Sequence, residues 1–445
     1  MTKAIWGVCL SVLMGTASTL FMPAFAQTAP EGAPLSQPSP PPGSDMGPGT
    51  EPPDPENATV MERSRPEYDA KGIPLGGFRL FPTMDVTATY DDNVRYQPSG
   101  TADWYFVEAP AFRLQSQWGL HFLELFGGLN NYNYAKDTGL NLTDWDIGGD
   151  GRLDVSHAFT VSMTGSFAES HEALSSPNTI GLQASPNRYY QPHGELTLRY
   201  QPDRLGFVVG EQIDRFDWQN TPELGGGTLI NTDRNETEYQ AYAKAFYDFS
   251  PGYSAFVRTA YDDRTFDLYA DRTGVHRDSV GYRVDGGVDL QLSHLIRGEF
   301  YAGWLDQHYA QNVANPLRSI SGLDFGASLD WLAQQDLTLH LMASHTIQDV
   351  VLSNVSAASN DNVSLAADYE AAHNIIIQGY GSYTHSHFGG TARTDEYPSA
   401  GIKGKYLLNE YLSAYVGYDY SNRSSNFPGI NFNANLLTFG ITGHI

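Results

Sequence analysis

Residues 279–291, Ser-Val-Gly-Tyr-Arg-Val-Asp-Gly-Gly-Val-Asp-Leu-Gln, alternate strictly between two kinds of side chain. The apolar or small residues are Val280, Tyr282, Val284, Gly286, Val288 and Leu290, and charged or polar residues stand between them at Arg283, Asp285, Asp289 and Gln291. A helix would distribute these side chains around its axis, whereas a strand sends alternate side chains to opposite faces. The stretch therefore predicts a β-strand with one apolar face and one charged face.

The same alternation, in stretches of roughly 13 residues, recurs from about Phe78 to the C-terminus. No helical segment lies between these stretches to cover the apolar faces, and many polar faces carry several charges. A barrel closed in lipid, apolar outside and polar inside, accounts for both observations. We therefore expect an all-β fold, a transmembrane antiparallel up-and-down β-barrel of about 18 strands, with 16 possible, over residues 77–445. A soluble acidic periplasmic protein would leave the repeated alternation unexplained.

The connections between the predicted strands alternate in length. Tight turns such as Ser250-Pro251-Gly252 and Asn409-Glu410 alternate with longer polar loops. The loops lie near residues 171–187, 219–235, 267–278, 309–317, 349–359, 388–394 and 424–431. Bacterial outer-membrane barrels have short periplasmic turns and longer outer loops. This rhythm predicts that both chain termini face the periplasm.

The N-terminal region predicts two further segments. Lys3, an apolar run over residues 4–20 and the sequence Ala24-Phe25-Ala26 are typical of a secretory signal peptide over residues 1–26. The only cysteine, Cys9, lies within it, so the mature chain would form no disulfide. Residues 27–76 are rich in Pro, Gly and Ser, and we expect a disordered periplasmic tether.

Composition narrows the possible partners. The formal net charge of −25 disfavours nucleic acid, whose phosphates attract Lys and Arg. The expected partners are outer-membrane lipid and lipopolysaccharide, the barrel assembly machinery, polysaccharide and periplasmic export proteins. No cofactor is expected.

Alternation assigns a set of charged side chains to the barrel interior. The candidates for lining a pore are Asp146, Asp150, Arg152, Glu195, Arg199, Lys244, Arg258, Arg283, Asp285, Arg297, Glu299, Lys403 and Lys405, together with Tyr301 and Tyr415. Rings of charge and hydrogen-bonding groups select what crosses a pore. The alternative interpretation, with similar weight, is that these charges pair across neighbouring strands and only hold the barrel together.

Aromatic residues gather with polar ones near the predicted loop ends, as in Phe216-Asp217-Trp218 and Tyr418-Asp419-Tyr420. Sugars stack on aromatic rings, but belts of Trp and Tyr mark the membrane interface of every such barrel, and this second interpretation is the stronger. Tyr301 and Tyr415 point inward by alternation and are the better candidates for contact with a solute.

The sequence indicates neither an enzyme nor a metal site. It contains no His-Glu-x-x-His motif, no Gly-x-Ser-x-Gly motif and no Gly-rich phosphate loop. Acidic pairs such as Asp91-Asp92 and Asp262-Asp263 supply too few ligands for calcium, which binds six to eight oxygens. They are better explained as solvated strand ends.

Three motifs resemble a known family. Tyr90-Asp91-Asp92-Asn93-Val94 closes the first predicted strand, Glu108-Ala109-Pro110-Ala111-Phe112 lies in the second, and Trp118-Gly119-Leu120-His121 follows it. This arrangement resembles the start of the putative β-barrel porin 2 family, and the likeness extends over residues 78–445 in length and strand rhythm. It implies an outer-membrane barrel, several family members being associated with exopolysaccharide production and export, and it carries no catalytic residues.

We therefore expect a non-enzymatic outer-membrane channel for passage or export of polysaccharide. The alternatives are a general diffusion porin and a non-conducting structural or binding barrel. A porin requires a loop folded inward, and by length only 171–187 and 219–235 qualify. An exporter requires a wide lumen and a periplasmic partner, and a structural barrel predicts an occluded lumen.

Overall fold

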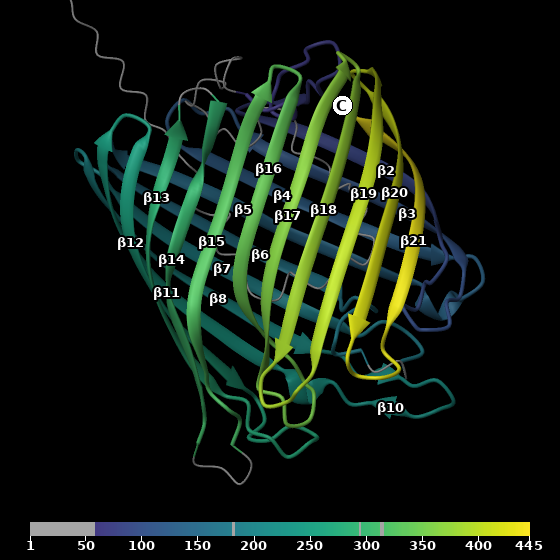
Figure 1. Ribbon diagram of the computed structural model, residues 1–445. Coiled ribbons are helices and arrows are strands. Elements are labelled where there is room, and N and C mark those ends of the chain that lie inside the picture. The colour runs from purple at the N-terminus through teal and green to yellow at the C-terminus, as the bar shows by residue number, and fades with distance from the viewer. Residues whose placement is uncertain (1–57, 180–182, 293–294, 312–315) are drawn as a thin grey trace, which may run out of the picture.

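The structure, a computed structural model, describes residues 58–179, 183–292, 295–311 and 316–445. Within them, 18 long strands pair antiparallel with their neighbours in chain order (Figure 1). The strands are β2 (Phe78–Asp91), β3 (Asp103–Ser116), β4 (Phe122–Tyr134), β5 (Leu142–Ser156), β6 (Phe159–His171), β7 (Arg188–Tyr200), β8 (Leu205–Trp218), β11 (Glu236–Ser250), β12 (Tyr253–Phe266), β13 (Ser279–Leu292), β14 (Ile296–Tyr309), β15 (Ile320–Gln334), β16 (Leu337–Asp349), β17 (Ala357–Ala372), β18 (Ile375–Phe388), β19 (Thr394–Asn409), β20 (Leu412–Ser425) and β21 (Phe432–His444).

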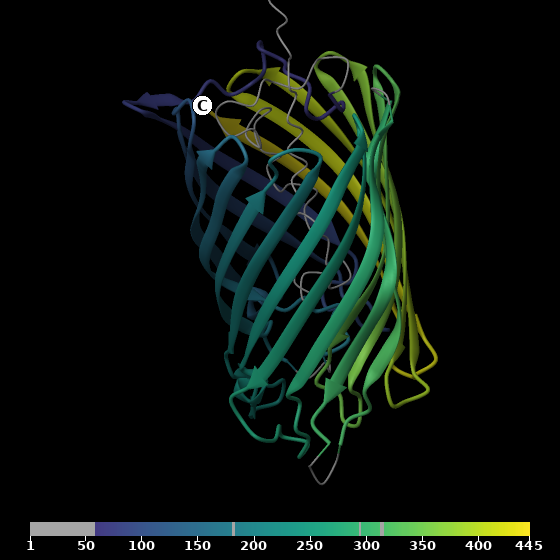
Figure 2. The ribbon, with the colours of Figure 1, turned by 90° about the vertical axis from the view of Figure 1, so that its left-hand side faces the viewer.

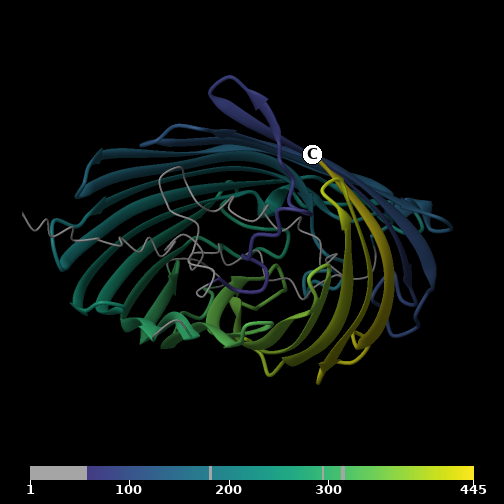
Figure 3. The ribbon, with the colours of Figure 1, turned by 90° about the horizontal axis from the view of Figure 1, so that it is seen from above.

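The first and last strands close the barrel. β2 pairs with β21 in a register that runs from Thr83 opposite His444 to Asp91 opposite Leu436. The strands run obliquely to the long axis of the barrel (Figure 2), and seen from above they surround a lumen (Figure 3). The predicted up-and-down barrel is confirmed, with 18 strands and not 16.

The two faces of the wall differ as the alternation predicts. In β13, Tyr282 and Val284 point outward and are each 54% exposed, whereas Asp285, the next residue along the strand, points inward and is 1% exposed. In β21 the outward residues are Leu437, Phe439 and Ile441. The outer surface is thus an apolar band, and the inner wall is polar.

The two ends of the barrel differ in their connections. Short turns join strands at the end where the C-terminus lies, here called the turn end, at the top of Figure 1. Longer segments join strands at the opposite end, the loop end. These segments include the 3-10 helices η2 (Thr138–Leu140) and η3 (Thr232–Arg234) and the hairpin of β9 (Thr221–Pro222) and β10 (Thr228–Leu229). No helix in the described ranges is long and apolar enough to cross a membrane.

Disorder was predicted for residues 27–76, and this prediction is wrong for residues 58–76. Residues 58–69 form a compact turn against the barrel, and β1 (Ile73–Leu75) pairs with the start of β2. Apolar Val60 and Met61 and the arginines of this segment supply the contacts that hold it against the barrel. The predicted signal peptide and residues 27–57 lie outside the described residues.

Candidate functional site

The inner wall carries the side chains that alternation assigns to it. Strand registers place Lys244 opposite Arg258 and Arg258 opposite Asp285, so these residues share one face. The same registers put the other predicted residues on this face, namely Asp146, Asp150, Arg152, Glu195, Arg199, Arg283, Arg297, Glu299, Tyr301, Lys403, Lys405 and Tyr415. That they line a conducting pore stays a prediction.

Many of these charges bind one another. Lys244 lies 2.9 Å from Glu299 and 3.2 Å from Asp289. Arg258 lies 3.2 Å from Asp285 and 3.4 Å from Glu299. Arg258 and Asp285 lie opposite each other on neighbouring strands, where opposite charges stabilise a sheet, and the other pairs reach over one or two strands along the inner wall. Along β11–β14 the arrangement therefore favours the interpretation in which the charges hold the wall together.

Tyr301 and Tyr415 face inward but lie flat on the wall. Tyr301 is opposite Gly326 and Tyr415 is opposite Gly440, and each ring occupies the space that a β-carbon on its glycine would fill. A cation covers each ring: Arg258 is 4.4 Å from the centre of Tyr301, and the Lys403 ammonium is 4.2 Å from that of Tyr415. Neither ring is presented to the lumen for stacking on a sugar.

Residues 58–69, here called the latch, lie against the inner wall at the turn end. The Val60 amide donates to the Thr338 hydroxyl at 3.0 Å. Arg63 and Arg65 lie 3.0 Å and 2.9 Å from the Glu370 carboxylate. Val60 is fully buried and packs with Ile376 and Leu407 of β18 and β19. Glu62 of the latch also forms an ion pair with Arg297 of β14. The latch therefore occupies part of the lumen at this end.

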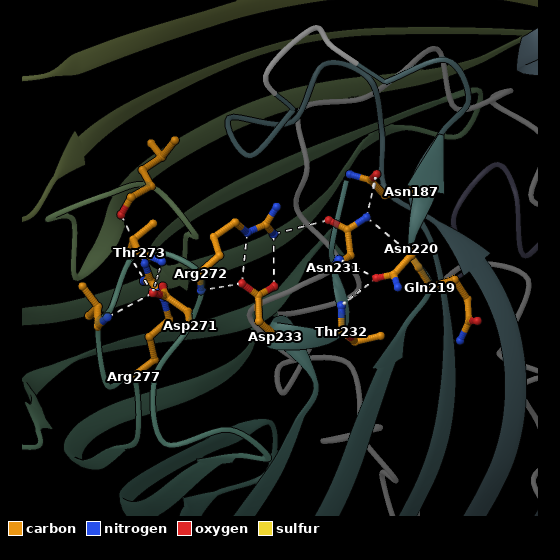
Figure 4. Close-up of polar contacts among 12 residues, drawn as sticks. Asn187, Gln219, Asn220, Asn231, Thr232, Asp233, Asp271, Arg272, Thr273 and Arg277 are labelled. Carbon is orange, nitrogen blue, oxygen red and sulfur yellow. Dashed lines mark hydrogen bonds and ion pairs between the residues drawn. The ribbon is translucent and has the colours of Figure 1, made fainter. Parts of the chain in front are cut away.

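At the loop end, four connecting segments fold together, and we call them the loop constriction: residues 172–187 without 180–182, 219–235, 267–278 and 350–356. Arg234 of η3 donates to both carboxylate oxygens of Glu172, each at 2.9 Å. Asn231 donates its amide to Asn187 at 3.0 Å, and Arg272 pairs with Asp233 at 3.0 Å (Figure 4). These contacts join the first three segments.

The loop constriction also connects nearly opposite walls of the barrel. The amide of Val351, between β16 and β17, donates to the Asn178 side chain, between β6 and β7, at 3.0 Å. Arg277, between β12 and β13, donates to the carbonyls of Val350 at 2.5 Å and Leu352 at 3.2 Å. Because the loops that carry Val351 and Asn178 start from nearly opposite strands, their contact requires that they extend across the lumen.

The expectation that only 171–187 and 219–235 could fold inward is therefore wrong. Residues 267–278 and 350–356 are shorter but also reach inward. The Arg277 side chain joins these two segments. Its Nε lies 2.6 Å from the Asp271 carboxylate of its own segment, and its other nitrogens donate to carbonyls of the 350–356 segment. A long side chain thus covers a distance that the loop length alone does not.

Glu172 and Asp271 are held as anions in these segments. Burial alone would raise the pKa of Glu172, but Arg234, Asn187 and Ser176 outweigh it, so its pKa lies below the ordinary value. For Asp271, burial is likewise outweighed, by bonds from Thr273 and the Val275 amide and by Arg277, and its pKa is lowered. Both charges therefore support the folded loops near neutral pH.

Beneath the loop constriction lies a cavity of about 230 Å³. Its lining combines aromatic rings with ionic groups from β6, β7, β8, β11, β12, β16 and the inward segments. The lining residues include Glu172, Phe216, Trp218, Arg234, Glu236 and Phe266.

Sequence reasoning missed these loop residues because it searched the strands for alternation. A usable signal was present: Asn231-Thr232-Asp233-Arg234-Asn235 and Asp271-Arg272-Thr273 place both signs of charge beside turn-forming residues. Glu236 begins β11 and follows the strand alternation, yet it was not among the predicted residues. Among the described residues there is no group of three or more His, Cys, Asp or Glu that could hold a metal ion.

Comparison with known proteins agrees with the barrel fold. The sequence pattern of the family described as Putative beta-barrel porin 2 matches residues 65–444. The chain belongs to this family. It is accordingly a porin-like β-barrel of the bacterial outer membrane. No curated protein matches the chain.

Solved outer-membrane barrels are similar to the chain at low identity. The ferric enterobactin receptor PfeA of Pseudomonas aeruginosa, in complex with enterobactin, is 9% identical with a TM-score of 0.45, over 82% of this chain and 81% of that one. The siderophore receptor PirA of Acinetobacter baumannii is 8% identical with a TM-score of 0.46, over 82% and 80%. Pseudomonas aeruginosa OccK3 is 13% identical with a TM-score of 0.43, over 82% and 96%. Likeness at this level says nothing of ligand or activity.

Proposed function

We propose that this family member is a non-enzymatic diffusion channel that passes small polar solutes across the outer membrane. The observation that carries the proposal is the loop constriction, in which segments from nearly opposite walls bind each other across the lumen. Inward-folded loops narrow a lumen to the size of a small solute, and their polar groups select among solutes.

The contact between Arg234 and Glu172, which joins two segments of the loop constriction, is ionic and buried. The side chains of Arg234 and Glu172 are only 6% and 4% exposed. Breaking a buried ion pair by removing one partner costs about 3–5 kcal/mol, because the other charge stays buried without compensation. Replacing Arg234 should therefore loosen two of the inward segments at once.

Single-channel conductance of the refolded full-length protein in a planar bilayer tests the proposal. We expect open steps in the wild type and a larger conductance in Arg234→Met. The conductance of the double variant Arg234→Met with Glu172→Gln should lie between those of Arg234→Met and the wild type, because the double variant leaves no buried charge unpaired. Silence from protein shown to be folded by its heat-modifiable migration, or unchanged conductance in Arg234→Met, would contradict the proposal.

Passage or export of polysaccharide is the second candidate function. The family resemblance suggests it, and a polar inner wall with charges on most strands supports it, because hydroxyl-rich chains hydrogen-bond to such groups. A polymer would require both the loop constriction and the latch to move, and periplasmic export proteins are the proposed partners for that step.

Oligosaccharides added to the bilayer experiment separate the two candidates. Block of the open steps by oligosaccharides favours the polysaccharide path, and conductance unaffected by them favours small solutes. Tyr301→Ala and Tyr415→Ala should leave any such block unchanged, because glycine and a cation already occupy the two faces of each ring. If the folded protein shows no conductance, the remaining interpretation is a structural barrel that binds a partner without conducting.

A further inference from the structure

Glu236 lies between two phenylalanine rings on the inner wall. It begins β11, where the strand registers place it opposite Phe216 of β8 on one side and Phe266 of β12 on the other. The three residues are 3%, 1% and 9% exposed, and all three line the cavity beneath the loop constriction. The wall of the cavity thus combines a carboxyl group with two flanking aromatic rings.

The Glu236 carboxylate is incompletely satisfied. Its Oε2 accepts no hydrogen bond from any described residue. A carboxylate taken out of water without a partner is strongly unfavourable, so a buried one binds a proton or a cation. The aromatic rings beside it favour an organic cation, because the faces of aromatic rings attract positive charge.

The basic groups of the cavity wall are engaged elsewhere. Arg277 pairs with Asp271 at 2.6 Å and binds loop carbonyls. Arg264, on the neighbouring strand, shares its one guanidinium among three carboxylates: Asp349 at 2.5 Å, Asp262 at 2.8 Å and Glu238 at 3.3 Å. Acidic groups therefore exceed basic ones around Glu236.

The same wall already holds one organic cation, which belongs to the chain itself. The Arg234 guanidinium lies 3.4 Å from the centre of the Trp218 ring and donates two bonds of 2.9 Å to Glu172. Carboxylate and aromatic ring together thus bind a guanidinium group within this cavity. Glu236 with Phe216 and Phe266 offers the same combination, without an arginine of the chain bound to its Oε2.

We propose that the cavity beside Glu236 is a binding site for small organic cations, with the ammonium or guanidinium group of the solute against the Glu236 carboxylate. This inference specifies the class of solute that the proposed channel takes, and it therefore rests on the proposed function. A cavity of about 230 Å³ is below the roughly 300–1,000 Å³ of drug-sized pockets, so the solute is small.

Binding can be measured without conduction, by titration calorimetry of the folded full-length protein in detergent with agmatine, which carries both a primary amine and a guanidinium group. We expect wild-type protein to bind agmatine and Glu236→Gln, which keeps the shape of the side chain, to bind about tenfold more weakly, as expected for loss of a close charge pair. Phe266→Leu, which removes a ring and keeps the charge, should also weaken binding.

The matched control is Glu410→Gln, the same change of charge in the turn between β19 and β20 at the opposite end of the barrel. It should bind agmatine as the wild type does. Equal affinity of wild type and Glu236→Gln for agmatine, or no binding of agmatine by folded wild type, overturns the inference. The absence of binding is the result expected if the Glu236 carboxylate binds only a proton.

The bilayer experiment keeps this inference distinct from the proposed function. A channel that conducts but does not bind agmatine refutes the cation site and leaves the diffusion channel in place. A silent barrel that binds agmatine through Glu236 refutes the channel and leaves a cation-binding barrel.

Discussion

Glu172 is the residue through which pH should act on the loop constriction. Its pKa in the folded protein lies below the ordinary value of 4.5, because Arg234 and hydrogen bonds outweigh burial. A lowered folded-state pKa stabilises the folded loops above the ordinary pKa, and that stabilisation is lost as pH falls through the folded value.

We therefore expect an unchanged conductance from neutral pH down to about 4.5, and a larger one at lower pH as the loops separate. Conductance recorded as a function of pH measures this, with Glu172→Gln as the comparison. Glu172→Gln should show less of the acid response, since it has no carboxylate to protonate. An acid response of the same size in both proteins would contradict a role for Glu172.

At the residue scale, sequence alternation predicted direction but not environment. Tyr301 and Tyr415 face inward as predicted, yet their rings lie on glycines of the next strand and beneath Arg258 and Lys403. Alternation reports which face a side chain takes within one strand. It contains no information on the residue opposite, which depends on the register between strands.

At the scale of elements, the latch should limit the lumen at the turn end. Deleting residues 58–69 removes the contacts of Val60, Arg63 and Arg65 with β16–β19, and we expect a larger conductance in the planar bilayer. Val60→Asp, which places a charge against Ile376 and Leu407, should act in the same direction, because a buried unpaired charge is strongly unfavourable.

The control for the latch is Lys71→Ala, just beyond it. Lys71 pairs with Glu410 but its side chain is 69% exposed, and such surface pairs contribute about 0–1 kcal/mol. Its conductance should match the wild type. If the deletion and Val60→Asp also conduct as the wild type does, the latch does not restrict the lumen.

The latch and the inward loops also show what element prediction lacked. A Pro-rich composition predicts disorder on average, but a few side chains suffice to dock a short segment onto a wall that is already folded. Arg65 does this by donating to both the Val60 carbonyl and Glu370. The position of Glu370, about 300 residues further on, is visible only once the barrel is closed.

For the whole molecule, the net charge of −25 should favour cations at both ends of the lumen. We expect cation selectivity that weakens as salt rises, because the Debye length falls from about 10 Å at 0.1 M to about 3 Å at 1 M. Reversal potentials across KCl gradients at low and high mean concentration measure it. A reversal potential of the opposite sign, or one independent of salt, would contradict this expectation.

The amino-acid sequence by itself determined the barrel, its approximate strand number, the inward and outward faces and the alternation of turns and loops. Side-chain alternation is a local property with a period of two, and one strand is enough to reveal it. Only the tertiary structure decided what occupies the lumen: the latch, the loop constriction, and the carboxylate of Glu236 between Phe216 and Phe266. These contacts join residues from different strands, and their geometry follows from registers and barrel closure.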